Sequence, residues 1–298
     1  MSMEDSKAQL SSGFALGPPW LFKGSALYQL HLVKAEVARA FIPKEFKLVQ
    51  AFGYTLGGFF LAHYEDSPVA TFDELVVIAG IVWNLPCSCA WAARVLVTNE
   101  EACRHGRKEI GLPSNVGMFS KQRFTEAREK SPSKYSNFLS MMGICCSNSS
   151  QEHVKFSISE VKDSSVMSFC SIVVPFIDPK LHENKSMGPK IRMSLPSFSG
   201  RTLHNPHLLK YACQVECRMR QVIPAVVCGP TKAGIDEYRD ENSESQLRNK
   251  ASVEDEALNR CMSIMLSKPV LALQFNFLEM QVDAPTIVAP HLTHAANA

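Results

Sequence analysis

Glycines inside long apolar stretches are the feature of this chain that most limits its fold. Tyr54–Tyr64 carries Gly57 and Gly58 within a run that is otherwise typical of a strand, and Asp73–Trp83 carries Gly80. Because glycine adds no side chain to a sheet, its presence in a strand usually marks a bulge or a sharp bend. These two stretches therefore predict a strongly curved sheet.

The rest of the chain predicts more strands and few helices. Polar and apolar residues alternate over His153–Val161 and over Leu208–Val222, which is the pattern of half-buried strands. Hydrophobic residues make up 46% of the chain, enough for a sizeable core. With about nine strands in all, we expect a β-rich α+β fold, a closed antiparallel β-barrel with a few short helices. Closed barrels of this size can enclose an apolar cavity.

Composition along the chain predicts a single domain over residues 18–285. Two stretches rich in charge and serine, 122–151 and 231–260, are interpreted as polar insertions at the surface. Residues 1–17 are expected to be a disordered N-terminal segment, and 286–298 a flexible tail.

Charge and cysteine usage exclude several classes of protein. The net charge is +2 and no basic run is present, which argues against a nucleic-acid partner. The 10 cysteines show neither a disulfide framework nor metal-ligand spacing, so we expect free thiols, no metal and no cofactor. No apolar run reaches the roughly 18 residues of a membrane span, and residues 1–13 lack the apolar core of a signal peptide. These features predict a soluble cytoplasmic protein, with the chloroplast as the open alternative.

The segment Gly106–Gly117 is the most informative candidate for a site. A helix is expected before it, and Gly111 followed by Pro113 ends that helix. The two residues after the proline, Ser114 and Asn115, are thereby presented at one fixed place by a rigid scaffold.

Two further residues are candidates for the lining of a pocket. Glu74 stands at the start of a strongly apolar strand, where it is either a solvated strand end or a carboxylate held in the barrel mouth. Trp91 is either a core residue or part of a cavity wall. The candidate pocket therefore contains Glu74, Trp91, Ser114 and Asn115.

These motifs resemble a known superfamily. An apolar strand, AARVLV, a helix and then GRKEIGLP follow the order found in the acetoacetate decarboxylase superfamily. Gly106, Arg107, Gly111 and Pro113 match the family's motif scaffold, and Gly117 matches its next glycine. Over nearly the full length, PPWLFKGSALYQLHLVKAEVARAFIPKEFKLV and ELVVIAGIVWN look like the plant neoxanthin-deficient protein family.

The resemblance implies a scaffold whose nucleophile is lost. In the decarboxylases two adjacent lysines follow the proline, and one of them forms a Schiff base with the substrate. Here those positions are Ser114 and Asn115, which have no amine, so no catalytic residue is assigned. Glu74 matches the family's pocket carboxylate, whereas the pocket arginine falls near Lys23 or Gly24 and is absent or replaced.

Three functions stay open from the sequence. The resemblance implies a non-decarboxylating barrel that is required for neoxanthin formation, and so for supply of the abscisic acid precursor, acting indirectly or by binding an apolar, carotenoid-like ligand. The second is an enzyme that uses Glu74 for acid–base chemistry on a carbonyl or a carotenoid such as violaxanthin. The third is a structural or regulatory partner of carotenoid-pathway proteins.

Overall fold

The architecture was analysed in a computed structural model. It describes residues 13–84, 87–126, 151–162, 165–175, 188–200, 206–230 and 256–288. The strands are β1 (Trp20–Lys34), β2 (Tyr54–Asp66), β3 (Phe72–Asn84), β4 (Cys87–Val97), β5 (Ser114–Glu126), β6 (Gln151–Lys162), β7 (Ser165–Pro175), β8 (Lys190–Gly200), β9 (Leu208–Val222), β10 (Val226–Cys228), β11 (Lys268–Val282) and β12 (Thr286–Val288). The helical elements are η1 (Gly13–Leu16), α1 (Ala35–Arg39), α2 (Glu100–His105), the π turn η2 (Gly106–Ile110) and residues 256–265.

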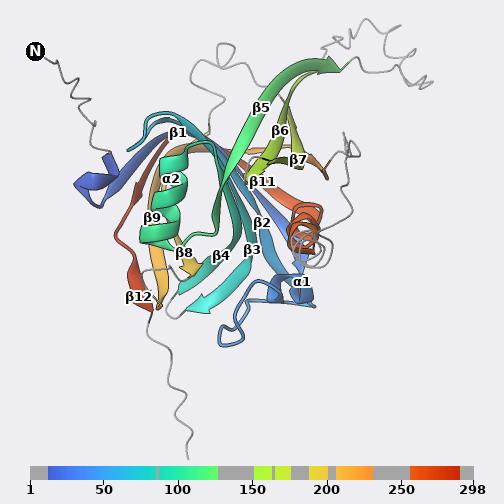
Figure 1. Cartoon of the computed structure of the whole chain (residues 1–298). Helices are drawn as coiled ribbons and strands as arrows, with labels where there is room; N and C mark the ends of the chain where they lie inside the picture. Colours follow the sequence, from blue (N-terminus) through green and yellow to red (C-terminus); the bar gives the residue numbers. More distant parts are fainter. Residues whose placement is uncertain are drawn as a thin grey trace, which may run out of the picture.

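Seven of the strands form a closed barrel, which confirms the predicted fold class (Figure 1). Neighbouring strands follow the order β4-β3-β2-β1-β11-β9-β8. The ring closes where β8 pairs with β4, Ala90 opposite Ser197 and Trp91 opposite Phe198. This one seam of the barrel is parallel, and the other pairs in the ring are antiparallel.

The internal glycines lie where the barrel wall bends. The register between β3 and β4 shifts on either side of Ile78, next to Gly80. At Gly58 the backbone φ is +128°, and an added Cβ would lie 2.1 Å from the carbonyl oxygen of Gln29. A larger residue at Gly58 would therefore meet both backbone strain and a clash.

A second group of strands extends from the barrel as a wing, shown rising away from it in Figure 1. β5 pairs in parallel with β4, because residues 98–113 with α2 form a crossover between the two strands. β6, β7 and β10 then add to β5 in order. Residues 122–126, expected in the first insertion, form the end of β5; the insertion's residues 127–150 lie outside the described part of the chain.

The barrel wall separates two hydrophobic cores. On β2, Phe60 and Tyr64 point into the barrel, while Phe59 and Leu61 pack on its outer face. The outer core is covered by α1 and by the helix at 256–265, which Figure 1 shows in orange beside α1. This helix includes 256–260 of the predicted second insertion; its residues 231–255 lie outside the described part.

Both predicted flexible ends contain ordered residues. In the N-terminal segment, Gly13 donates its backbone N–H to the carbonyl oxygen of Pro68 at 3.0 Å, and η1 places Phe14 against the barrel. At the other end β12 pairs with β9. The described structure therefore begins before residue 18 and continues past residue 285; residues 1–12 and 289–298 lie outside it.

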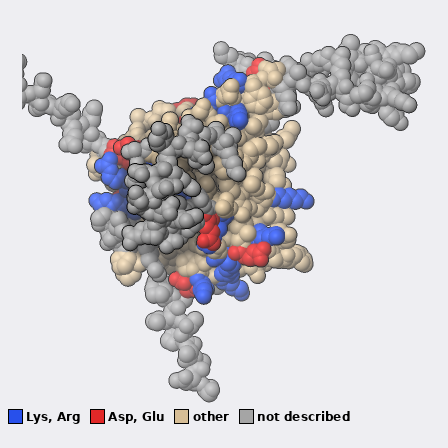
Figure 2. All heavy atoms as spheres, turned by 45° about the vertical axis from the view of Figure 1, so that its right-hand side comes forward, with Lys and Arg blue, Asp and Glu red and all other residues tan. Residues whose placement is uncertain are grey.

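Charges of both signs are interspersed over the face shown in Figure 2, with wide areas of uncharged surface between them. This matches the near balance of 31 basic and 29 acidic residues in the chain. Among the described residues no helix is long and apolar enough to cross a membrane.

Candidate functional site

The barrel interior contains a cavity of about 240 Å³, which we call the barrel cavity. Its wall is mainly aromatic and aliphatic, and residues of α2 and η2 line part of it. Figure 1 shows α2 between β9 and β5. A small number of polar side chains interrupt this apolar wall. They are Tyr28, Tyr64, Glu74, Ser88, His105, Ser114, Ser197, Tyr211 and Cys213.

Glu74 is the acidic group of the cavity. The alternation of β3 buries Leu75 and Val77 in the outer core and turns Glu74 and Val76 toward the interior. Burial raises the pKa of Glu74 to about 7, although a hydrogen bond from Tyr64 opposes the rise. The protonated and ionised forms are thus both populated near neutral pH, which suits a carboxyl group for proton transfer or for hydrogen bonding to a ligand.

Two tyrosines accompany this carboxyl group. The hydroxyl of Tyr64 donates to Oε2 of Glu74 at 2.8 Å. Burial, and next the neighbouring Glu74, raise the pKa of Tyr64 well above its ordinary value; burial is also the main cause of the raised pKa of Tyr211. Both phenols therefore stay protonated and act as hydrogen-bond donors or acceptors.

Ser114 reaches the cavity through the turn after α2. The helix begins at Asn99, whose side chain accepts from the backbone N–H groups of Glu101 at 2.9 Å and Ala102 at 3.0 Å. The π turn η2 continues from the helix and ends at Gly111, whose φ of +80° suits glycine. Ser114 then opens β5 and is only 2% exposed.

The motif scaffold holds this turn in place. Gly106 lies so close to Ser114 that an added Cβ would be 2.8 Å from the serine Oγ. Arg107 donates its Nε–H to the carbonyl oxygen of Ser114 and an Nη2–H to Oδ1 of Asn115. Gly106 and Arg107 thus fix where the two residues after Pro113 lie.

The structure brings two of the four candidate pocket residues together in one cavity. Glu74 and Ser114 both line it, whereas Asn115 and Trp91 do not. The Asn115 side chain is held by Arg107 instead. Trp91 belongs to the outer core, with its ring centroid 5.6 Å from that of Phe46, because β4 turns Ala90 and Ala92 inward.

Sequence reasoning missed His105 and Phe14. The His105 ring stacks on Phe14 with 3.8 Å between the ring centroids and makes an edge-on contact with Trp20 at a centroid distance of 4.4 Å. Aromatic rings therefore cover the imidazole on two sides. Its buried Nε2 has no hydrogen-bond partner within the described part of the chain, and burial lowers its pKa to about 4. His105 is therefore neutral at physiological pH. The sequence signal for its position was its spacing of three residues from Ala102, which places both residues on the helix face that lines the cavity.

The described lining of the barrel cavity contains neither lysine nor arginine. A Schiff base needs a primary amine, so the described wall offers no residue for that reaction. Within the described ranges no group of three or more His, Cys, Asp or Glu side chains is placed to hold a metal ion.

Comparisons with known proteins give the family. The chain is 57% identical over 275 residues to Protein NEOXANTHIN-DEFICIENT 1 of Solanum lycopersicum, covering 91% of this chain and 92% of that protein. The proteins of the same name from Oryza sativa and Arabidopsis thaliana are 54% and 52% identical, covering 96% and 97% of this chain and 94% and 99% of their own lengths. The chain belongs to the NEOXANTHIN-DEFICIENT 1 family. The family resemblance read from the sequence is confirmed.

Other comparisons are more distant. No protein-family model matches the sequence. Among solved structures, an acetoacetate decarboxylase from Legionella pneumophila is similar with a TM-score of 0.49 at 10% identity, covering 98% of this chain and all of that one. The enduracididine biosynthesis enzyme MppR gives 0.48 at 12% identity, with 92% and 89% covered. Likenesses at this level say nothing of the chemistry of this barrel.

Proposed function

We propose that this protein supports neoxanthin biosynthesis, and so the supply of the abscisic acid precursor, as a non-decarboxylating barrel that binds a ligand. Its membership of the NEOXANTHIN-DEFICIENT 1 family supports the assignment to this pathway. The cavity supports the mode of action, since it is preformed, mostly apolar and furnished with a few converging polar groups. The observation that carries the proposal is the pairing of Glu74 with Tyr64 in a described wall that has no lysine.

The size of the barrel cavity limits the ligand. Its 240 Å³ lies below the roughly 300–1,000 Å³ of ordinary ligand pockets. At roughly 30 Å³ for each water it has the volume of about eight water molecules. A whole carotenoid does not fit, so the ligand is a small molecule or one end group of a larger one.

Two assays of the purified protein test this mode of action. With acetoacetate followed by borohydride, we expect no covalent adduct on the protein, and with violaxanthin we expect no conversion to neoxanthin. Extraction of the protein purified from plant tissue should release a bound small molecule, and the Glu74→Gln variant should retain less of it. An adduct on the wild type, or an extract equally empty for both proteins, would refute ligand binding without covalent chemistry.

A second candidate is an enzyme in which Glu74 is the acid or base. The raised pKa of Glu74, about 7, favours it, because such a group can both give and take a proton at neutral pH. This candidate would be favoured over the first if the purified protein turned over violaxanthin in a defined assay, if the rate changed with pH with a midpoint near 7, and if Glu74→Gln abolished the activity.

We propose the cytoplasm as the site of action, with the chloroplast as the alternative. We also propose carotenoid-pathway proteins as candidate partners. Imaging of a fluorescent fusion in leaf cells decides between the compartments. Affinity purification from the same cells tests the partners. If the wild type and a surface-mutated copy recover the same carotenoid enzyme equally well, that outcome would argue against a specific contact.

A further inference from the structure

A tight hairpin turn between α1 and β2 exposes an aromatic side chain at one end of the barrel. Figure 1 shows this loop in blue at the lower end of the molecule. Ala51 and Tyr54 exchange two backbone hydrogen bonds of 2.9 Å, so that Phe52 and Gly53 form a two-residue turn. Both turn residues have positive φ, +50° and +80°, the combination found in a type I′ turn.

Phe52 is an unusual residue for the first position of such a turn. Asparagine, aspartate and glycine are the residues that ordinarily occupy it, and a bulky side chain in this backbone region is an outlier. The Phe52 side chain is also fully exposed to solvent, so packing within the chain does not compensate for the strain. Backbone strain of this kind is typical of functional positions, and here it points to a partner outside the chain.

Three more large apolar side chains lie near this tip and are partly exposed. Tyr54, Leu56 and Trp83 are 41%, 43% and 45% exposed. The backbone N–H of Trp83 donates to the carbonyl oxygen of Lys47 at 2.8 Å, which joins the end of β3 to the segment that leads into the turn. We call Phe52, Tyr54, Leu56 and Trp83 the aromatic rim.

The aromatic rim continues the inner face of the barrel wall. Ile81 lines the barrel cavity, and Trp83 lies two residues further along the same face of β3. Tyr54 and Leu56 likewise share the face of β2 that Phe60 presents to the cavity. The rim is therefore where the inner face of the wall reaches the surface.

Basic side chains flank the aromatic rim. From residue 34 to residue 56 the chain has four basic and two acidic residues. Lys44 and Lys47 are exposed, and among the described residues no acidic side chain lies within ion-pairing distance of either ammonium group. Their charges are therefore available to an anionic partner.

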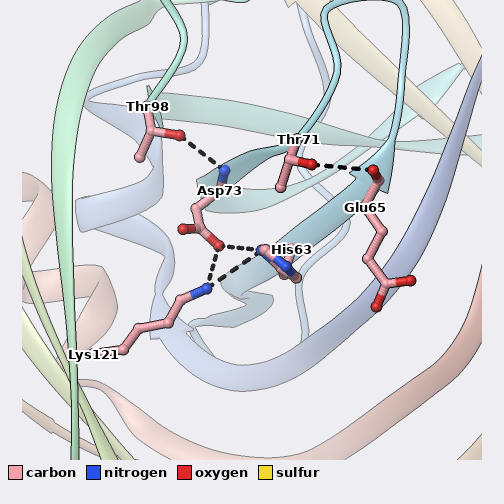
Figure 3. A network of polar contacts seen from close by, with 6 residues as sticks. All are labelled: His63, Glu65, Thr71, Asp73, Thr98 and Lys121. Atoms are coloured by element: carbon pink, nitrogen blue, oxygen red, sulfur yellow. Dashed lines mark hydrogen bonds and ion pairs between the residues drawn. The ribbon is translucent and has the colours of Figure 1, made fainter.

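A polar cluster elsewhere on the barrel shows the contrast. It lines a groove of about 970 Å³ between the outer face of the barrel and the wing. There Oδ1 of Asp73 accepts from Nζ of Lys121 at 2.7 Å and lies 2.8 Å from Nδ1 of His63 (Figure 3). The charge of Lys121 is thus balanced within the protein, unlike the charges beside the aromatic rim.

We infer that the aromatic rim docks on the surface of a lipid bilayer that carries anionic headgroups. Tryptophan and tyrosine favour the headgroup level of a bilayer, and an exposed phenylalanine inserts among the acyl chains. Lysines beside them are attracted to the negative surface potential of anionic lipids. This inference goes beyond the proposed function and requires no particular ligand in the barrel cavity. Docking would bring the inner face of the barrel wall against the bilayer.

Flotation of the full chain with vesicles tests the inference. One set of vesicles is phosphatidylcholine alone, and the other is phosphatidylcholine mixed with phosphatidylglycerol. We expect tighter binding to the mixed vesicles, and weaker binding as salt is added. Trp20 and Trp91 are buried, so Trp83 is the exposed member of the three tryptophans. The tryptophan emission should therefore shift to shorter wavelength when the vesicles bind.

Substitutions separate the apolar contribution from the charged one. Phe52→Asn should lower the partition coefficient for mixed vesicles at least about tenfold, because it removes the buried ring. It should fold as well as the wild type, since asparagine suits this turn position. Lys44→Gln and Lys47→Gln should each lower binding about fivefold. Ala51→Phe, which adds a ring beside the tip, should bind no less tightly than the wild type.

The matched control is Phe277→Asn. Phe277 is also an exposed phenylalanine with a φ of +50°. Its neighbour Leu278 is opposite Gly24 on β1, whereas Tyr54 is opposite Lys34. These ten residues of β1 span roughly 33 Å, so Phe277 lies far from the aromatic rim. Phe277→Asn should bind both kinds of vesicle as the wild type does.

Four outcomes would overturn the inference. They are no binding of the wild type to mixed vesicles, equal binding to both kinds of vesicle, and equal losses in Phe52→Asn and Phe277→Asn. The fourth is a wild-type dimer, measured by light scattering without vesicles, that Phe52→Asn converts to a monomer. That result would assign the aromatic rim to a second copy of this chain.

Discussion

At the scale of single residues, the buried carboxyl of Glu74 makes stability depend on pH. Its folded pKa of about 7 lies above the ordinary pKa of 4.5 for this carboxyl, so the folded state binds the proton more tightly than the unfolded state. The resulting stabilisation is present below pH 4.5 and is lost as pH rises through 7.

Glu74→Gln should remove this loss, because glutamine stays neutral and can still accept from Tyr64. Relative to the wild type, the variant's free energy of unfolding should rise by about 3 kcal/mol between pH 4.5 and pH 8. Urea unfolding at the two pH values measures the change, and Glu65→Gln at an exposed site is the control. A difference from the wild type that does not vary with pH would contradict the assigned burial of the charge.

Substitutions at the two residues after Pro113 test whether the Schiff-base lysine is missing from this protein. The wild type should release no carbon dioxide from acetoacetate, because Ser114 and Asn115 have no amine. Ser114→Lys should recover little activity, and the double variant with Asn115→Lys more, since a neighbouring ammonium lowers a lysine pKa. Carbon dioxide release and borohydride trapping measure both effects; decarboxylation by the wild type would show that the nucleophile lies elsewhere.

At the scale of elements, a buried amide ties the outer segments to the barrel. Oε1 of Gln29 accepts from the backbone N–H of Ala225 at 2.7 Å, and its Nε2 donates to the carbonyl oxygen of the same residue at 3.1 Å and to His31. Nδ1 of His31 in turn reaches the carbonyl oxygen of Ile264, in the helix at 256–265, at 3.2 Å. This chain of bonds requires a neutral imidazole, in agreement with the lowered pKa of His31, whose main cause is burial.

Gln29→Leu should therefore cost about 3 kcal/mol of unfolding free energy, because it leaves two buried backbone groups of Ala225 without this partner. Gln214→Leu, at an exposed strand position, is the matched control and should cost little. Urea unfolding of both variants measures the difference. Similar stabilities would show that water replaces the lost bonds at Ala225.

The sequence predicted most of the barrel strands but not which of their faces meet, and β12 and the start of the helix at 256–265 fall in stretches that were expected to be a tail and an insertion. Glycines within strands predicted the barrel, and the motif around Pro113 predicted a fixed presentation of Ser114. Trp91 was ambiguous because apolar residues line both sides of the barrel wall, so that alternation cannot tell inside from outside. His105 and Phe14 could not be paired from the sequence, since 90 residues of chain separate them and their stacking depends on tertiary packing.

At the scale of the whole molecule, the barrel wall separates the small cavity inside it from a larger groove outside it. The wall between them is one residue thick, so adjacent residues of a strand serve opposite sides. On β2, Tyr64 faces Glu74 inside the barrel, while its neighbour His63 binds Asp73 outside. Substitutions can therefore address each hollow separately.

The most direct test of the central claim fills the barrel cavity in a living plant. Ala92 lines it from β4 and is only 8% exposed, so Ala92→Phe should occupy the space that the ligand needs. In a plant lacking this protein, the wild type and the surface control Ala51→Phe should restore neoxanthin. Ala92→Phe, confirmed to be folded and equally abundant, should leave neoxanthin low. Full restoration of neoxanthin by Ala92→Phe would contradict a role for the barrel cavity.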